Sequence, residues 1–207
     1  MSEASDEQLY ERWRGGDQDA AAELSRRRLP GVRRLVHSML TGDEAHDAIQ
    51  EVFERLAKRA SEGGEVKHVK AFVAGMARNV IRERLRKRQR EAVDAPERSL
   101  ADISPNQSVE IQRKEEHRLL LKALHRMPVD DQILIALRYW ERLRTRQLAE
   151  IFELKQSTLR TRLQRAEGKL QKLVQELAES PEAMESTMGS LTAWARERGG
   201  GHAQEKS

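Results

Sequence analysis

The sequence predicts an all-α fold of two small helical domains joined by a flexible linker. Apolar residues recur at steps of three and four along most of the chain, and no sustained alternation indicates a strand. A segment rich in proline, serine and acids interrupts this periodicity near the middle. With 207 residues, 38% hydrophobic and 35% charged, the chain can bury one modest core or two small ones.

The first predicted domain covers residues 1–90 and contains four helices. Glycines at Gly15-Gly16, at Gly42 and at Gly63-Gly64 separate the periodic stretches, because glycine favours turns and helix ends. The expected helices span residues 6–13, 17–40, 43–60 and 69–90.

A linker is predicted over residues 91–107, where the apolar spacing lapses and Pro96 and Pro105 occur. The second domain, residues 108–177, is expected to contain four more helices. Their predicted ranges are 108–126, 129–142, 145–152 and 156–177.

The C-terminal extension, residues 178–207, is predicted to form a short amphipathic helix and a disordered tail. Ser180-Pro181 is a favourable helix start, and the glycines at 199–201 would end the helix. Its apolar face would consist of Met184, Met188, Leu191 and Trp194.

The stretch ARNVIRERLRKRQR at residues 77–90 is strongly basic, and Glu83 is its only acid. An ordinary exposed helix carries acids three or four residues away from its basic residues. This stretch has almost none, so its arginines are expected to lack compensating charge. Phosphate groups would relieve their mutual repulsion. The stretch therefore predicts a nucleic-acid surface, with an ordinary solvated helix face as the alternative.

Residues 145–170 have the spacing of a helix-turn-helix, in which the second helix enters the major groove of DNA. Leu159, Leu163, Ala166 and Leu170 would face inward. The alternative is a helical hairpin with a polar outer face. The candidate DNA-binding side chains are hydrogen-bond donors and cations, namely Gln156, Ser157, Thr158, Arg160, Thr161, Arg162 and Arg165.

Several classes of protein are disfavoured. The chain has no cysteine, its histidines are dispersed, and HExxH, GxxxxGK[ST] and GxSxG motifs are absent. We therefore expect no catalytic residue, metal site or cofactor. The longest apolar run, ILIAL at 133–137, is too short to span a bilayer, and the acidic N-terminus lacks a signal segment. A cytoplasmic protein without membrane insertion is expected.

From residue 6 to about residue 175 the chain resembles the extracytoplasmic-function (ECF) sigma factors of bacterial RNA polymerase. DEQLYERWRGGDQDAAAEL, LPGVRRLV and DAIQEVFERL resemble the beginning of their region 2, and FVAGMARNVIRERLRKR resembles its DNA-reading end. LLLKALHRMPVDDQILIALRYWERL and the helix-turn-helix resemble region 4. The order and spacing of these motifs carry the resemblance.

The resemblance implies an alternative sigma factor that binds core RNA polymerase and directs it to promoter DNA. Region 2 would open and read the minus-10 element, while region 4 would read the minus-35 element and touch the flap of the beta subunit. Asn79 matches the asparagine near the captured base, with Arg78, Arg82 and Arg86 on the DNA backbone. The residues that match the docking site for the coiled coil of the beta-prime subunit are Asp47, Gln50, Glu51, Phe53 and Leu56.

Some alternatives remain open. Phe53 and Leu56 suit core packing equally well. Glu153 stands where the family usually has a turn glycine, and Lys155 where it usually has a helix cap. A helix-turn-helix regulator with an N-terminal sensing or dimerising domain is the rival function, although it leaves the arginines of 78–90 unexplained. The promoter sequence, the inducing signal and the existence of an anti-sigma factor are not specified by the sequence.

Overall fold

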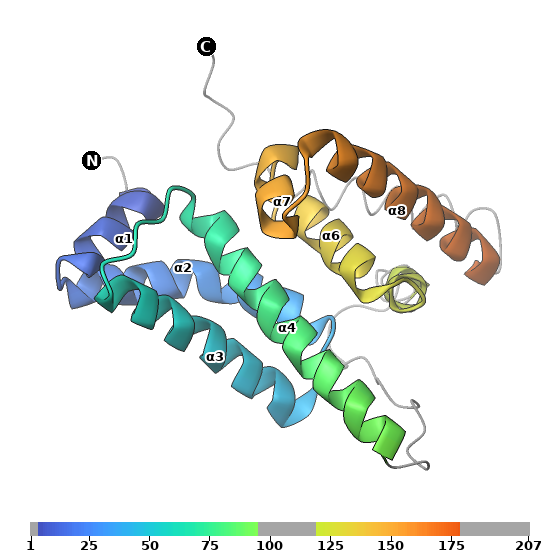
Figure 1. The fold of residues 1–207 in the computed structure, drawn as a ribbon, viewed down its shortest axis with the longest axis horizontal. Helices are drawn as coiled ribbons and strands as arrows, with labels where there is room; N and C mark the ends of the chain where they lie inside the picture. Colours follow the sequence, from blue (N-terminus) through green and yellow to red (C-terminus); the bar gives the residue numbers. More distant parts are fainter. Residues whose placement is uncertain (1–3, 95–118, 179–207) are drawn as a thin grey trace. The chain divides into compact units, whose positions relative to one another are not determined.

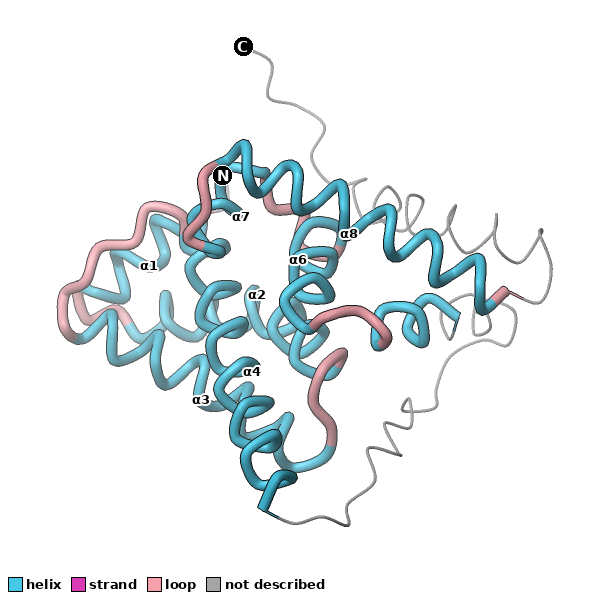
Figure 2. The backbone as a smooth tube through the Cα atoms, turned by 45° about the vertical axis from the view of Figure 1, so that its right-hand side comes forward, coloured by secondary structure: helices cyan, strands magenta, loops and turns pink. Residues whose placement is uncertain are grey.

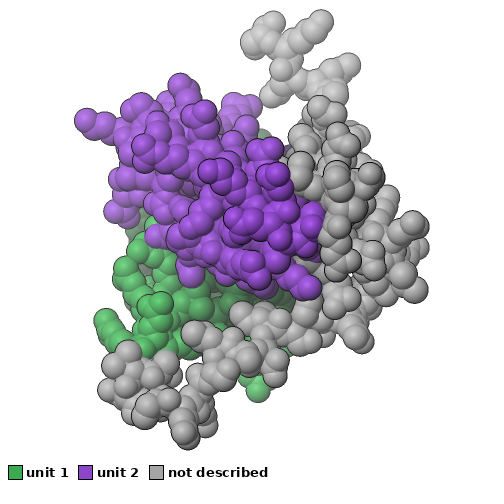
Figure 3. All heavy atoms as spheres, turned by 90° about the vertical axis from the view of Figure 1, so that its right-hand side faces the viewer, with its two compact units in different colours: residues 1–103 green, residues 104–207 purple. Residues whose placement is uncertain are grey.

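The computed structural model describes residues 4–94 and 119–178, and all regular structure in these ranges is helical (Figures 1 and 2). The predicted all-α class is therefore confirmed. The chain divides into two compact units, residues 1–103 and 104–207, which Figure 3 distinguishes by colour. Each unit is described by itself. None of the described helices is long and apolar enough to cross a membrane.

The described part of unit 1 contains four helices, α1 (Asp6–Arg14), α2 (Gln18–His37), α3 (Gly42–Ser61) and α4 (Val69–Asp94). Gly16 and Gly63 occupy the connections in left-handed conformations, with φ of 97° and 71°, which glycine adopts without steric cost. The turns therefore lie where the glycine spacing predicts them. Fully buried side chains from α2, α3 and α4 form the core: Leu24, Val36, Leu56, Val80 and Ile81.

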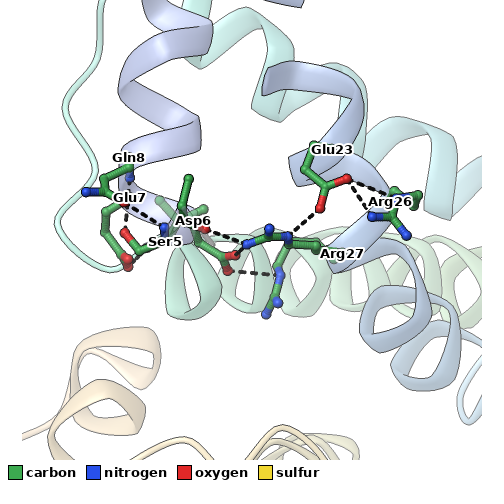
Figure 4. Close-up of polar contacts among 10 residues, drawn as sticks. Ser5, Asp6, Glu7, Gln8, Glu23, Arg26 and Arg27 are labelled. Carbon is green, nitrogen blue, oxygen red and sulfur yellow. Dashed lines mark hydrogen bonds and ion pairs between the residues drawn. The ribbon is translucent and has the colours of Figure 1, made fainter. Parts of the chain in front are cut away.

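The N-terminus of α1 is capped and tied to α2 (Figure 4). Ser5 and Gln8 form a capping box, because each side chain accepts a hydrogen bond from the other residue's backbone N–H. Asp6 contacts two arginines of α2, with Oδ2 3.0 Å from Arg28 Nε and Oδ1 4.0 Å from Arg27 Nη1. These contacts hold the first turn of α1 on α2.

α1 also fixes the loop that leads into α4. The Tyr10 hydroxyl donates to the Gly64 carbonyl at 2.9 Å, and Arg14 Nη2 donates to the Gly63 carbonyl at 2.7 Å. Glu7 Oε1 accepts a hydrogen bond from the Val69 backbone N–H at 3.3 Å. Since Val69 is the first residue of α4, α1 supplies a carboxylate to one of the unsatisfied donors of that helix start.

Two boundaries in unit 1 differ from the prediction. α4 continues to Asp94, four residues beyond its predicted end at Arg90. The acids and alanine at 91–94 remain compatible with a helix, and the first strong breaker is Pro96. α2 ends at His37 instead of Leu40 and stays helical through Pro30. The rest of the predicted linker lies outside the described residues.

Unit 2 contains a helical segment at 119–125, then α6 (Val129–Tyr139), α7 (Thr145–Phe152) and α8 (Gln156–Leu177). The bounds of α7 and α8 agree with the prediction. The first part of the helix predicted at 108–126 and the C-terminal helix predicted after Ser180 lie outside the described residues. The fully buried side chains of unit 2 include Ile133, Leu134, Ile135, Leu137, Leu143, Leu148, Leu159 and Leu170.

Candidate nucleic-acid interface

The arginines of α4 lie on two sides of the helix, and one side faces acids on α3. α3 and α4 pack against each other in unit 1 (Figure 1). Arg84 Nη2 lies 2.8 Å from Glu51 Oε2, and Arg84 Nη1 lies 3.9 Å from Asp47 Oδ2. One turn along α4, Arg88 pairs with Glu44. We call these five residues the α3–α4 ion-pair row.

Glu51 of the ion-pair row has two arginine partners. Besides Arg84, its carboxylate accepts a hydrogen bond from Arg55 of its own helix, and Arg55 also pairs with Glu83 of α4. Burial acts to raise the pKa of Glu51, but the hydrogen bonds from Arg84 and Arg55 outweigh it and hold this pKa below its ordinary value. The carboxylate is therefore charged near neutral pH.

This row corrects one sequence-based expectation. Spacing within residues 78–90 predicts arginines that lack compensating acids, because it reflects only acids on the same helix. For Arg84 and Arg88 the compensating acids lie on α3, more than thirty positions earlier in the chain. Compensation across a helix pair leaves no trace in i,i+4 spacing.

The other side of α4 carries most of the residues assigned to nucleic acid. Asn79 and Arg86 are exposed, Arg82 is half-buried, and Arg86 makes no ion pair within the described residues. Steps of three and four place these three on one side of the helix. Arg78 differs, because it is only 6% exposed and donates from Nη1 to Asn79 Oδ1 at 3.4 Å. The structure places Arg78 within the bundle, beside the Asn79 amide.

The residues assigned to polymerase docking occupy different environments on α3. Asp47 and Gln50 are exposed, Glu51 and Phe53 are half-buried, and Leu56 is fully buried in the unit 1 core. The first four are therefore accessible at the surface, whereas Leu56 packs against the other helices.

In unit 2 the connection between α7 and α8 is a tight turn. Glu153 follows α7 in a left-handed conformation, with φ 55° and ψ 40°. This conformation costs a non-glycine residue about 1 kcal/mol. The Leu154 backbone N–H donates to the Ala149 carbonyl at 2.9 Å, which closes the end of α7. α8 begins at Gln156, and the Lys155 side chain makes no capping hydrogen bond.

α8 presents a polar face and buries an apolar one. Leu159, Leu163, Ala166 and Leu170 are buried, as the spacing predicts. The residues predicted to point outward are all exposed, namely Gln156, Ser157, Thr158, Arg160, Thr161 and Arg165.

Arg162 is the exception among the candidate DNA-binding residues of α8. Its Nε and Nη2 atoms both donate to Asp131 Oδ1 of α6, at 2.9 and 2.8 Å. Its guanidinium carbon lies 5.6 Å from the ring centroid of Phe152 in α7. One side chain therefore connects all three helices, and the geometry favours positioning of α8 over contact with a base.

A second contact holds the middle of α8 to the end of α6. The Tyr139 hydroxyl donates to Glu167 Oε1 at 2.8 Å. Burial, together with this hydrogen bond, raises the pKa of Tyr139 to about 12.

Sequence reasoning missed the roles of Tyr139 and Glu167, and those of Glu44 and Arg88 in unit 1. Acids at 44, 47 and 51 opposite cations at 84 and 88 would have indicated the row, had an antiparallel helix pair been assumed.

Comparison with known families identifies both units. The Sigma-70 region 2 family matches residues 24–91, and the Sigma-70 region 4 family matches residues 117–170. Together the two matches span more than half of the chain. The chain belongs to the sigma-70 family. Its two matched regions, in this order, are those of an ECF sigma factor, as the motifs predict.

Solved structures support the fold of this sigma factor. The sigma factor RpoE from Bartonella quintana, crystallised with the anti-sigma factor NepR, is 23% identical, with a TM-score of 0.61 over 74% of this chain and 96% of that chain. CnrH, solved with the cytosolic domain of CnrY, is 16% identical, with a TM-score of 0.64 over 84% of this chain and 99% of that chain. Among curated protein sequences the comparison finds no match.

Regions 2 and 4 define what such a protein does. The chain is an alternative sigma factor that binds core RNA polymerase and directs it to promoters, and sigma factors of this family act as transcription factors that carry no catalytic site of their own. α3 and α4 lie within the region 2 match, and the helix-turn-helix lies within the region 4 match. Among the described residues no group of three or more acidic or histidine side chains is placed to hold a metal ion.

Proposed function

We propose that this sigma factor contacts promoter DNA through two separate helix faces and polymerase through a third. The observation that carries the proposal is that α4 and α8 each expose a polar and cationic face inside a matched sigma-70 region. Residues 1–90 would bind polymerase and the minus-10 element, residues 108–177 would bind the minus-35 element, and residues 91–107 would link them.

At the minus-10 element the outward side of α4 would act. Asn79 supplies an amide that can hydrogen-bond to an unpaired base, and Arg82 and Arg86 supply cations to the flanking phosphates. Arg78 is buried, so we assign it to holding the Asn79 side chain in place. Its earlier assignment to the DNA backbone fits this position less well.

At the minus-35 element the exposed first turns of α8 would enter the major groove. Arg160 and Arg165 are suited to base edges or phosphates, and the short side chains of Ser157, Thr158 and Thr161 allow close approach. Arg162 would set the orientation of this helix through Asp131 instead of touching DNA.

Polymerase would dock on α3. Asp47, Gln50 and Glu51 form an acidic and polar surface that suits a cationic partner, and Phe53 adds apolar area beside it. The coiled coil of the beta-prime subunit is the proposed partner, and the flap of the beta subunit is the proposed partner of residues 108–177. Leu56 would support this surface from the core.

Regulation by an anti-sigma factor is also proposed. RpoE is bound to the anti-sigma factor NepR in its crystal structure, and CnrH is bound to the cytosolic domain of CnrY. A protein partner of the NepR type is consistent with the shared fold. Because its targets are polymerase and promoter DNA, we place the sigma factor in the cytoplasm and propose that it catalyses no reaction.

Reconstituted transcription tests these assignments. Asn79→Ala should form the closed complex at a cognate promoter but open fewer base pairs, because the lost amide acts on an unpaired base. Permanganate footprinting measures this opening, and equal thymine reactivity in variant and wild type would remove Asn79 from the site.

Polymerase pull-down tests the docking surface. Phe53→Ala should retain less polymerase than wild type while keeping its helical circular dichroism.

The rival function makes a different prediction. A helix-turn-helix regulator would bind its promoter tightly without polymerase, so strong sequence-specific binding by the chain alone would favour the rival.

A further inference from the structure

The ion-pair row joins two surfaces that have different proposed partners. Its acids Asp47 and Glu51 belong to the proposed polymerase-docking surface of α3. Its cations Arg84 and Arg88 belong to the basic helix α4, whose other side is proposed to face DNA. The same carboxylates therefore serve as partners for polymerase and as partners for two arginines of the DNA-facing helix.

Carboxylate and phosphate oxygens compete for the same guanidinium groups. The planar fork of an arginine binds either anion through the same N–H donors, so donors committed to Glu51 or Glu44 are withheld from phosphate. The row is only partly buried, since the side chains of Arg84 and Arg88 are 26% and 44% exposed. Solvent and a competing anion can therefore reach both arginines without unfolding of the bundle.

A partner that binds the docking surface could release the arginines from these acids. Asp47 is 66% exposed, more than any other side chain of the row, so a cationic side chain of a partner could bind it. Such a partner would also attract Glu51, which accepts hydrogen bonds from Arg84 and Arg55. Each carboxylate that turns to the partner loosens its hold on α4.

We propose that Arg84 and Arg88 are a latent phosphate-binding pair, which the acids of α3 mask in the free protein and which polymerase unmasks when it docks on those acids. The ligand is the phosphate backbone of promoter DNA. The idea rests on the proposed docking role of α3. Linkage makes the effect reciprocal, because DNA bound to Arg84 and Arg88 strengthens polymerase binding by the same factor.

The masking can be measured on the free, full-length chain. Binding of a short fluorescein-labelled single-stranded DNA is followed by anisotropy for the wild type, Glu51→Gln, Arg84→Gln and the double variant. Glu51→Gln should bind about twofold to fivefold more tightly, the range expected when one partly exposed ion pair is released. The slope of log affinity against log salt should steepen by about 0.7, as expected for one additional phosphate contact.

Two comparisons separate unmasking from a general gain of positive charge. Glu62→Gln removes the same charge from the other end of α3, where Glu62 pairs, within the described residues, only with Lys58 at 3.9 Å, and it should leave affinity unchanged. The gain of Glu51→Gln should vanish in the Arg84→Gln background. Equal gains in Glu51→Gln and Glu62→Gln, or a gain that survives loss of Arg84, would overturn the proposal. If Glu51→Gln fails to fold, Asp47→Asn replaces it.

Experiments with polymerase test whether docking releases Arg84. Arg84→Gln should leave DNA binding by the free protein unchanged but weaken promoter binding by the holoenzyme, and equal effects in both states would overturn the coupling. Pull-down of polymerase with Glu51→Gln tests the docking surface separately. Tighter DNA binding with unaltered polymerase association would support the masking and overturn the docking role of Glu51.

Discussion

Both units carry an arginine-rich helix, α4 in unit 1 and α8 in unit 2, but the neighbouring helices balance the arginines differently. α3 presents a row of acids along its length, so one side of α4 is neutralised while the other stays cationic. Asp131, near the start of α6, forms an ion pair with Arg162 of α8. Arg160 and Arg165 make no ion pair within the described residues.

This difference has a functional meaning. A helix that recognises duplex DNA needs one fixed orientation. The orientation of α8 is fixed by its buried apolar face, by Tyr139 and by the inward Arg162. In the proposed mechanism α4 acts only after polymerase has bound, and the row on α3 would then change the availability of its cations. A charge run therefore identifies a binding face only when the facing helix is known.

The largest effect is expected from the outward arginines of α8. Arg160→Ala or Arg165→Ala should each weaken binding to the minus-35 element by about 1–3 kcal/mol, because each removes a base or phosphate contact. Neither change should affect polymerase association or the melting temperature. Titration of the holoenzyme on an upstream fork template measures the loss. A variant that also loses polymerase would show that its arginine is structural.

Arg162 should behave in the opposite way. Asp131→Ala leaves Arg162 without its half-buried partner and should lower the free energy of unfolding of unit 2 by about 1–2 kcal/mol. Chemical denaturation of the full chain, followed by Tyr and Trp fluorescence, measures this loss. Glu150→Ala removes the same charge from α7, where Glu150 makes an exposed pair with Arg146 at 3.5 Å, and is the matched control. If Arg162→Ala weakens DNA binding without any loss of stability, Arg162 contacts DNA after all.

Acid should affect unit 1 through Glu51. Its folded-state pKa lies below the ordinary value of 4.5, so its contribution to stability is present above pH 4.5 and is lost as pH falls through the folded-state pKa. Because the pair is partly exposed, the contribution should not exceed about 1 kcal/mol. Thermal unfolding of Glu51→Gln and wild type, compared at neutral and acidic pH, should show a smaller acid-induced drop in the variant.

Unit 2 should respond at the other end of the pH scale. The pKa of Tyr139 is raised to about 12, so its stabilising effect is present below its ordinary value of 10 and is lost as pH rises through 12. Tyr139→Phe should therefore reduce the sensitivity of unit 2 to alkali and leave the acid response of unit 1 unchanged. A variant that altered both responses would show that the two units unfold together.

The smallest effect is expected from removal of residues 178–207. The apolar face predicted for Met184, Met188, Leu191 and Trp194 needs cover, so truncation after Leu177 should change transcription modestly, in either direction. Multi-round transcription from a cognate promoter measures this. If the truncated and full-length proteins match in activity, stability and partners, the extension has no role in these functions.

Local signals predicted most of the helices. Glycines place the ends of α1 and α3 within about two residues, and the apolar spacing places those of α7 and α8, because both signals act over a few neighbouring positions. The outward orientation of Arg160 and Arg165 follows from the same periodicity. Residues whose side chains are settled by tertiary partners were less predictable.

Arg84, Arg162 and Arg78 illustrate the limit. In helical spacing Arg84 and Arg162 look like any other surface arginine, but Glu51 and Asp131 lie 33 and 31 positions away in the chain. Arg78 is buried because the helix turns it toward the core beside Ala77. Nothing in residues 77–90 alone distinguishes Arg78 and Arg84 from Arg86, since the distinction depends on which helix lies opposite.

The hydrogen bonds that α1 makes to the start of α4 bear on how this protein can be divided and recombined. The family match begins at Leu24, inside α2, so a fragment cut at that edge would lack Glu7, Tyr10 and Arg14. The N–H of Val69 and the carbonyls of Gly63 and Gly64 would lose their partners. For domain grafting or the assembly of chimeric sigma factors, the exchangeable module is therefore residues 4–94, because its register depends on a helix that the family boundary leaves out.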